Sequence, residues 1–255
     1  MNKEFLASIN SAVDSKEEFF IADFGPKKIK IFFEDQACDW VWNYKYIYQK
    51  EALDIRSETN SSLDIKKIAL INYFYTFIVR DILNLNNYIS PTIKSVLDIG
   101  AGIGLFDLFL NQILEHKTSF DLIEVDKLDE IEHVTNNPAN TKKLKKNIQI
   151  NPVITLKKLM VANSAKSINI IESQSIKQYF HKKYDLILSF RSWGYLYDLS
   201  LYEEFVIKTL NPDGVVITDL SIFDDSIDKF YSLFRDVTLI NESPNNKRFL
   251  GQTLR

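Results

Sequence analysis

The chain has 255 residues, of which 45% are hydrophobic and 25% are charged, and its formal net charge is −3. This length and composition suit a globular α/β domain with an extension. The negative charge argues against a general nucleic-acid-binding surface, which needs a basic face. Cys38 is the only cysteine, which excludes an intrachain disulfide and a cysteine metal cluster. Because the first residues also lack an apolar signal-peptide core, we expect a cytoplasmic protein.

Residues 1–92 predict a mainly helical extension or lid. Apolar residues recur at helical spacing in 5–13 and again in 65–85. The most apolar stretch, 68–83, carries polar residues and is shorter than a membrane-spanning helix, so we expect a buried helix and no membrane span. Polar–apolar alternation at the start of 28–33 predicts a strand.

An aromatic run at 40–48 is compatible with two structures. Trp40, Trp42 and Tyr44 alternate with other residues as in a strand, yet the same rings can line one side of a helix. In either structure, we expect these rings to pack in a core or under a lid.

Residues 93–255 alternate predicted strands and helices in the manner of a doubly wound parallel sheet. Strands are expected at 94–99, 119–125, 168–172, 184–190 and 215–220, and helices at 104–115, 153–163 and 200–209. A polar insertion is expected at 127–150 and a tight turn at 211–214. Two extended segments, 237–240 and 248–253, predict a closing antiparallel β-hairpin.

The most informative stretch reads Asp98-Ile99-Gly100-Ala101-Gly102-Ile103-Gly104. A buried strand ends in an acid and breaks into a turn with glycines at alternate positions, and a helix follows. Such glycines let the backbone turn tightly and approach a ligand, and the helix N-terminus adds free N–H groups and a positive dipole end. The spacing differs from the G-x-G-x-x-G of nucleotide dehydrogenases, which hold a pyrophosphate.

The Asp-x-Gly-x-Gly-x-Gly spacing, with Phe106 two residues after the last glycine, resembles motif I of the class I S-adenosylmethionine-dependent methyltransferases. The resemblance implies a Rossmann-like, mostly parallel seven-stranded sheet whose last strand inserts antiparallel between the fifth and the sixth. The predicted closing hairpin agrees with it, and the two signals together cover 94–255. We therefore expect a methyltransferase domain at 93–255 that uses S-adenosylmethionine as its cofactor.

The resemblance also implies which residues bind the cofactor. An acid about 20 residues past the glycine turn can accept hydrogen bonds from both ribose hydroxyls. Glu124 and Asp126 would point the same way from their strand, and Glu124 fits the family's pattern better. Asp98 is expected to face the methionine ammonium, and Ser173 or Gln174 the adenine amino group. The predicted cofactor-binding set is Asp98, Gly100, Ala101, Gly102, Gly104, Glu124, Val125, Ser173, Gln174 and Ser189.

The segment after the fourth strand, 189–198, corresponds to motif IV of this family, beside the transferring methyl group. It lacks the Asn/Asp-Pro-Pro-Tyr/Phe that many amino-group and base methyltransferases carry there. Arg191 can grip a carboxylate or phosphate, and Trp193, Tyr195 and Tyr197 can stack on a sugar or ring. These four are the predicted substrate-binding residues. The Arg-Ser-Trp-Gly run is similar to loops of sugar O-methyltransferases of bacterial surface-polysaccharide pathways.

The predicted reaction is methyl transfer to an oxygen of a small polar or anionic metabolite, such as a sugar or a phosphorylated group. The predicted catalytic residues are Arg191, Tyr195 and Asp198, and a water-linked acid near Asp219 is an alternative base. Three other functions stay open: an RNA, protein or amino-group methyltransferase, an NAD(P)-binding oxidoreductase, and a non-catalytic cofactor-binding protein. The sequence leaves the oligomeric state open.

The histidines and the main lysine cluster add no further site. His116, His133 and His181 do not lie at the carboxyl end of a predicted strand and are expected on the surface. No metal-ligand spacing is visible, so we predict no metal. The lysines within 142–146 predict a solvated helix face.

Overall fold

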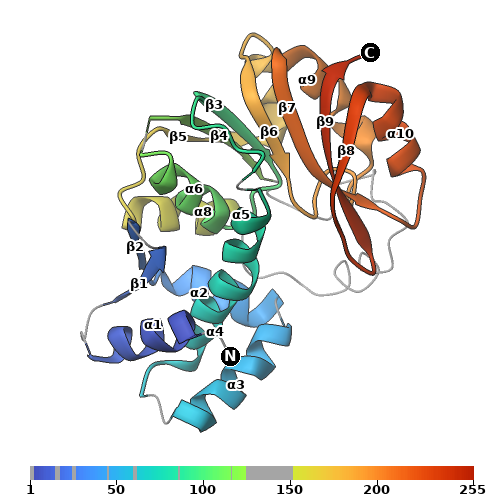
Figure 1. The fold of residues 1–255 in the computed structure, drawn as a ribbon. Coiled ribbons are helices and arrows are strands. Elements are labelled where there is room, and N and C mark those ends of the chain that lie inside the picture. Colours follow the sequence, from blue (N-terminus) through green and yellow to red (C-terminus); the bar gives the residue numbers. More distant parts are fainter. Residues whose placement is uncertain are drawn as a thin grey trace. The chain divides into compact units, whose positions relative to one another are not determined.

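The computed structural model describes the whole chain except residues 1–2, 15–17, 25–26, 45, 60–61, 86, 116 and 125–151 (Figure 1). The chain divides into two compact units. Unit 1 contains Met1–Tyr88, Gly102–His116 and Pro152–Lys166. Unit 2 contains Ile89–Ala101, Lys117–Asn151 and Ser167–Arg255. The division of the chain after residue 92 stays a prediction, and the predicted insertion at 127–150 falls outside the described residues.

Unit 1 is mostly helical and contains one β-hairpin (Figure 1). Its strands are β1 (Phe19–Phe24) and β2 (Lys27–Phe32), and its helices are α1 (Lys3–Asp14), α2 (Asp35–Tyr44), α3 (Tyr46–Thr59), α4 (Ile65–Tyr73), η1 (Phe74–Val79), α5 (Arg80–Leu85), α6 (Leu105–Ile113) and α8 (Pro152–Ala162). The strands pair antiparallel, with Phe19 opposite Phe32. Strand β2 confirms the strand predicted at 28–33, whereas β1 is not among the predicted elements.

The start of the aromatic run, 40–44, belongs to helix α2. Ala37 and Val41, four residues apart, are fully buried, whereas Trp40 and Trp42 are partly exposed. Burial at a spacing of four residues is the pattern of an amphipathic helix and differs from the alternation of a strand. The structure therefore selects the helix from the two alternatives.

Helices α4, η1 and α5 follow one another without a break from Ile65 to Leu85. Asp64 caps the first of them, because its side chain accepts a hydrogen bond from the backbone N–H of Lys66 at 2.8 Å. The combined helix has 21 residues and is, by length and composition alone, long and apolar enough to cross a membrane. This helix extends beyond the apolar stretch 68–83 at both ends, and a single helix of this kind is weak evidence for a membrane span. The expected burial holds, since 76% of its most apolar window lies inside the protein.

Unit 2 is built on a seven-stranded sheet (Figure 1). Its strands are β3 (Ser95–Ile99), β4 (Ser119–Glu124), β5 (Ile168–Glu172), β6 (Tyr184–Ser189), β7 (Leu210–Ser221), β8 (Phe234–Glu242) and β9 (Asn246–Leu254), and its helices are η3 (Ser173–Tyr179), η4 (Leu199–Leu201), α9 (Glu203–Thr209) and α10 (Ser226–Leu233). The strand order is β5-β4-β3-β6-β7-β9-β8. Strands β3 to β7 are parallel, and β9 pairs antiparallel with both β7 and β8. This confirms the predicted sheet, including the last strand between the fifth and the sixth.

The second half of unit 2 differs from the prediction in two places. Residues 211–214 are part of β7 and do not form a separate tight turn. Leu210 already pairs with Tyr184, and the register shifts before Leu186 pairs with Val215. Helix α10, between β7 and β8, is also not among the predicted elements.

Candidate functional site

The glycine turn follows β3 and has a backbone that glycine adopts without strain. Gly100, Gly102 and Gly104 have φ angles of +80°, +62° and +71°, in the region that a Cβ disfavours. Asp98, which precedes the turn near the end of β3, is only 3% exposed. The chain passes from unit 2 into unit 1 after Ala101.

The part of the turn in unit 2 contacts strand β4 and the loop after β6. The backbone N–H groups of Gly100 and Ala101 donate to the carbonyl oxygen of Ile123, on β4, at 2.8 and 3.2 Å. A Cβ added to Gly100 would lie 1.9 Å from Oγ of Ser192, in the loop after β6. The loops that follow β3 and β6 are therefore in contact at the carboxyl edge of the sheet, which is where open α/β sheets bind ligands.

Glu124 ends β4, the strand beside β3, and is 9% exposed. Burial raises the pKa of Tyr197 and Tyr202, and the nearby negative charge of Glu124 raises both further. The carboxylate thus lies within electrostatic reach of the loop after β6. Val125 and Asp126, the other residues predicted here, lie outside the described residues.

The loop at 190–198 is compact and contains two left-handed residues, Arg191 with φ +56° and Gly194 with φ +84°. The carbonyl oxygen of Ser192 accepts three hydrogen bonds, from the backbone N–H groups of Tyr195 at 3.1 Å, Leu196 at 2.7 Å and Tyr197 at 3.0 Å. A left-handed backbone at a residue other than glycine costs about 1 kcal/mol and concentrates at functional loops. Arg191, which is partly exposed, keeps its place as a candidate substrate-binding residue.

Two predicted contact residues are instead built into the support of this loop. Trp193 is fully buried, and its Nε1–H donates to the carbonyl oxygen of Leu199 at 2.6 Å. Ser189 is also fully buried: its hydroxyl donates to the carbonyl oxygen of Ile99 at 2.8 Å and accepts from the N–H of Trp193 at 2.8 Å. We therefore do not include Trp193 as a stacking residue, or the Ser189 hydroxyl as a cofactor contact, in the candidate site.

The two acids predicted as possible bases are already engaged. Asp198 accepts hydrogen bonds from the N–H of Ser200 at 2.9 Å and from Nζ of Lys229 at 3.1 Å. Burial opposes ionisation of Asp198, but these hydrogen bonds and the charge of Lys229 hold its pKa below the usual range. Asp219 is fully buried and accepts two bonds from the guanidinium of Arg248, at 2.7 and 2.9 Å. Both carboxylates are thus already paired with a basic side chain, and a role for Asp198 as a base stays a prediction.

Tyr195 and Tyr197, which were predicted to bind the substrate, are 8% and 5% exposed.

Ser173 and Gln174, which were predicted to face the adenine, are the first two residues of η3, directly after β5. The side-chain amide of Gln174 donates to the carboxylate of Glu172 at 3.1 Å. Because β5 is the parallel neighbour of β4, these residues follow the same edge of the sheet as Glu124. Their contact with an adenine stays a prediction.

Sequence reasoning missed Ser192 and Arg248. Arg248, on β9, is the register partner of Asp219, on β7. Its guanidinium carbon also lies 4.1 Å from the ring centroid of Phe190, the first residue of the loop after β6. The sequence could have indicated this pair only through an acid and an arginine on neighbouring strands. That pattern can be recognised only when the register of the two strands is known. The closing hairpin thus takes part in shaping the candidate site.

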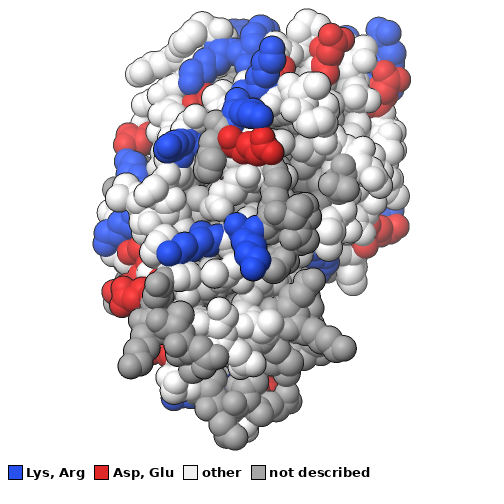
Figure 2. All heavy atoms as spheres, turned by 60° about the vertical axis from the view of Figure 1, so that its left-hand side comes forward, with Lys and Arg blue, Asp and Glu red and all other residues white. Residues whose placement is uncertain are grey.

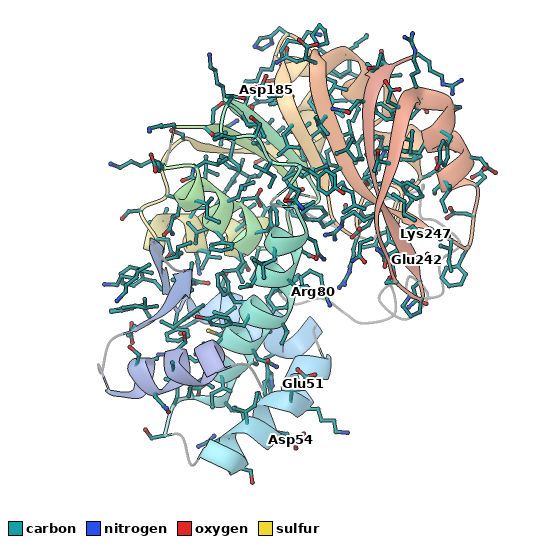
Figure 3. All side chains as sticks on the ribbon, viewed as in Figure 1. Glu51, Asp54, Arg80, Asp185, Glu242 and Lys247 are labelled. Atoms are coloured by element: carbon teal, nitrogen blue, oxygen red, sulfur yellow. The ribbon has the colours of Figure 1, made fainter. Side chains whose placement is uncertain are left out.

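Figure 3 shows the two ends of the sheet in unit 2. Asp185, near the start of β6, lies at one end and accepts hydrogen bonds from the N–H groups of Lys94 at 2.8 Å and Ser95 at 3.1 Å. Glu242 and Lys247, which form a salt bridge at 3.0 Å, lie at the other end, at the tip of the β8–β9 hairpin. The carboxyl ends of the parallel strands share that end of the sheet with the hairpin tip, since Ser221 pairs with Asn246.

The histidines do not contribute to the site as described. His181 is exposed, as predicted, and His116 and His133 lie outside the described residues. Within the part of the chain that the structure describes, no group of three His, Cys, Asp or Glu side chains is placed to hold a metal ion.

No protein-family model matches this chain, and no curated protein matches it in sequence. Solved structures do match. The chain is similar to the StiE O-MT, residues 961–1257, with a TM-score of 0.51 and 15% identity over 79% of this chain and 81% of that chain. It is also similar to the T. thermophilus 16S rRNA N2 G1207 methyltransferase (RsmC), in complex with AdoMet and guanosine, with a TM-score of 0.50 and 16% identity. That match covers 69% of this chain but only 42% of the RsmC chain. The strand order, the antiparallel last strand and these likenesses agree: the chain has the fold of the class I S-adenosylmethionine-dependent methyltransferases.

Proposed function

We propose that this protein is an S-adenosylmethionine-dependent methyltransferase. The observation that carries the proposal is the glycine turn at the carboxyl end of β3. Three left-handed glycines follow the buried Asp98, and the neighbouring parallel strand ends in Glu124. The turn lacks the glycine spacing that brings a dinucleotide pyrophosphate onto a helix N-terminus. A ligand with a ribose and a cationic amino group, but without a pyrophosphate, suits these residues better.

The two acids match the polar groups of S-adenosylmethionine. A carboxylate offers two acceptor oxygens, which suit the two donors of a vicinal diol or the donors of an ammonium group. In this proposal, Glu124 accepts from the ribose hydroxyls and Asp98 from the methionine ammonium. Both carboxylates are nearly buried, and buried charges persist when they are paired. Glycine at 102 keeps the turn free of a side chain, so the backbone can be approached closely.

When bound, S-adenosylmethionine would supply a methyl group carried on a sulfonium for in-line transfer to an acceptor oxygen, with the sulfur leaving as a neutral thioether and the acceptor's proton passing to water. The protein contributes chiefly by aligning the two reactants and excluding water. The compact loop at 190–198 suits that task, because Ser192 packs on Gly100 and fixes the loop beside the turn. Of the residues predicted to be catalytic, Tyr195 is the one that has a hydroxyl group, and it lies in this loop.

We infer further that the acceptor is a small polar or anionic metabolite, such as a sugar or a phosphorylated group, bound by Arg191. The support is that Arg191 is partly exposed and has a left-handed backbone in the loop that follows β6. On the face drawn in Figure 2, basic side chains gather toward the upper end and acidic side chains stand beside them. The formal net charge of −3 favours a small acceptor over RNA, whose binding needs a basic face.

The cofactor assignment is tested by calorimetric titration with S-adenosylmethionine, S-adenosylhomocysteine and NADH. We expect the first two to bind and NADH to give no heat. Glu124→Gln keeps the size of the side chain but removes its charge, and should weaken binding at least about tenfold, the value of a hydrogen bond to a charged group. Glu204→Gln is the matched control, since Glu204 is an exposed acid on α9, and should bind normally. Binding of NADH without S-adenosylmethionine would favour the oxidoreductase alternative.

The acceptor assignment is tested by methyl transfer from labelled S-adenosylmethionine to sugars, phosphosugars, amino acids and tRNA. With the acceptor that this screen finds, Arg191→Ala should bind the cofactor normally and lose at least tenfold in kcat/KM, because an anionic group loses its bidentate partner. Normal turnover by Arg191→Ala would refute the anionic acceptor. Transfer to tRNA alone would select the RNA methyltransferase alternative, and tight binding with no transfer at all would favour a non-catalytic cofactor-binding protein.

A further inference from the structure

A tryptophan from helix α2 lies against the part of the glycine turn that belongs to unit 1. A Cβ added to Gly102 would lie 3.9 Å from both Cη2 and Cζ2 of Trp40. These are the only heavy atoms of the described, non-adjacent residues within 4 Å of that position. Among the residues that the structure describes, the indole ring therefore bounds the side of Gly102 that a side chain would occupy. Trp40 itself is partly exposed.

Trp40 is the first ring of a row of aromatic side chains within unit 1. Its ring centroid lies 6.1 Å from that of Tyr73, at an interplanar angle of 63°. Tyr73 stacks on Phe77 at 5.3 Å and 18°. The guanidinium carbon of Arg80, which Figure 3 labels on the long helix, lies 5.4 Å from the centroid of Phe77. Tyr73 and Phe77 are each 7% exposed, so the partly exposed indole contacts a nearly buried ring that is itself stacked on a second one.

The long helix changes its winding where it carries this row. Tyr73 is the last residue of α4, and Phe77 lies inside η1, a π-helix of six residues from Phe74 to Val79. The π-helix is rare because its hydrogen bonds are less favourable than those of an α-helix, and its occurrences gather at functional sites. The irregular segment thus begins directly after Tyr73, the ring that Trp40 contacts, and this observation is independent of the contact between Trp40 and Gly102.

We propose that Trp40 is a cofactor-binding residue whose indole ring forms one wall of the S-adenosylmethionine site at Gly102, with Tyr73 and Phe77 holding the ring in place. The proposal rests on the proposed function. An indole offers a flat apolar surface and a negative ring face, which suit the purine and the sulfonium of this cofactor.

The chain offers a matched pair for the test. Trp40 and Trp42 both belong to α2 and are both partly exposed, but residues two apart on a helix point to opposite sides. The third tryptophan, Trp193, is fully buried in unit 2. Tryptophan fluorescence during titration with S-adenosylhomocysteine therefore reports on Trp40 if the ligand touches it. The measurement is made on the full chain and on Trp40→Phe and Trp42→Phe.

We expect wild type and Trp42→Phe to show the same fluorescence change, and Trp40→Phe to lose most of it. Trp40→Leu should raise the Kd for S-adenosylhomocysteine about five- to tenfold, and Trp42→Leu should leave it unchanged. The inference is overturned if Trp40→Phe keeps the full signal and Trp40→Leu keeps the wild-type Kd. Because the phenylalanine variants retain a ring, they keep the test open should Trp40→Leu fail to fold. If the wild type binds neither S-adenosylmethionine nor its product, the proposed function itself has failed.

Discussion

At the scale of single residues, the glycine turn serves two separate purposes. Gly100 is required by packing, since the side chain of Ser192 occupies the place where a Cβ would lie. Gly102 is required by its φ angle of +62°, while the space beside it accepts a methyl group at ordinary contact distance from Trp40. Glycines of one motif are thus required for different physical reasons, and substitutions can distinguish these reasons.

The comparison of Gly100→Ala with Gly102→Ala measures the packing constraint. Both variants place alanine in a left-handed backbone, which costs about 1 kcal/mol. Only Gly100→Ala also collides with Ser192, and overpacking of this kind costs a further 1–3 kcal/mol or so. Urea unfolding should therefore show Gly100→Ala to be the less stable variant by about 2 kcal/mol. Adding Ser192→Gly to Gly100→Ala should remove most of that difference. Equal stability of the two alanine variants would show that the loop after β6 does not pack on Gly100.

At the scale of elements, the closing hairpin does more than complete the sheet. Its strand β9 brings Arg248 beside Asp219, and the guanidinium also stacks on Phe190 at the start of the loop after β6. Arg248 is 4% exposed and Asp219 is fully buried. The pair therefore joins β9, β7 and that loop in a region where water cannot replace either partner.

Arg248→Met removes the positive partner and leaves the Asp219 carboxylate buried without its counter-ion. Loss of one member of a buried pair costs about 3–5 kcal/mol, and we expect a loss of that size in the free energy of unfolding. Lys247→Met is the control on the neighbouring residue. Its salt bridge with Glu242 is solvent-exposed, and such pairs contribute about 0–1 kcal/mol. Asp219→Asn combined with Arg248→Met should recover part of the loss, because no charge is then left unpaired. A loss no larger than that of Lys247→Met would mean that the pair does not hold the hairpin.

The elements also show what the sequence could predict. An apolar run between turn residues predicted strand β5 at 168–172, and the glycine spacing predicted the turn after β3. Both predictions succeeded because both signals are local in the sequence. The composition of 211–214 is that of a turn, yet Leu210 is drawn into the sheet by its pairing with Tyr184. A pairing of this kind joins distant residues and leaves no trace in local composition.

For the candidate site, the limit of prediction is the same. Motif spacing identified Asp98 and Glu124, and the structure places both near the carboxyl ends of neighbouring strands. The burial of Trp193 could not be read from its sequence neighbours, because an indole beside a ligand and an indole in a core have the same local pattern. The contact between Trp40 and Gly102 joins residues far apart in the chain and needed coordinates.

At the scale of the whole molecule, four buried groups make stability sensitive to alkaline pH. Burial raises the pKa of the Cys38 thiol in unit 1. In unit 2, burial raises the pKa of Tyr184, which also donates a hydrogen bond to Asp121, and of Tyr197 and Tyr202, to whose shifts the charge of Glu124 adds. All four groups stay protonated in the folded protein above the pH at which the unfolded chain releases their protons.

Stability should therefore be fully present below the unfolded pKa values, about 8.5 for the thiol and about 10 for the phenols, and should fall as pH rises above them. Each group lowers the free energy of unfolding by at most about 1.4 kcal/mol per pH unit beyond its unfolded pKa. Urea unfolding between pH 7 and pH 11 should thus show a gentle decline that begins near pH 8.5 and a steeper one above pH 10. Cys38→Ala should abolish the first decline and leave the second. Absorbance at 295 nm supplies the independent reading, because Tyr184, Tyr197 and Tyr202 should ionise only when the protein unfolds. Titration of all 12 tyrosines near pH 10 in a protein that is still folded would contradict the burial of these three side chains.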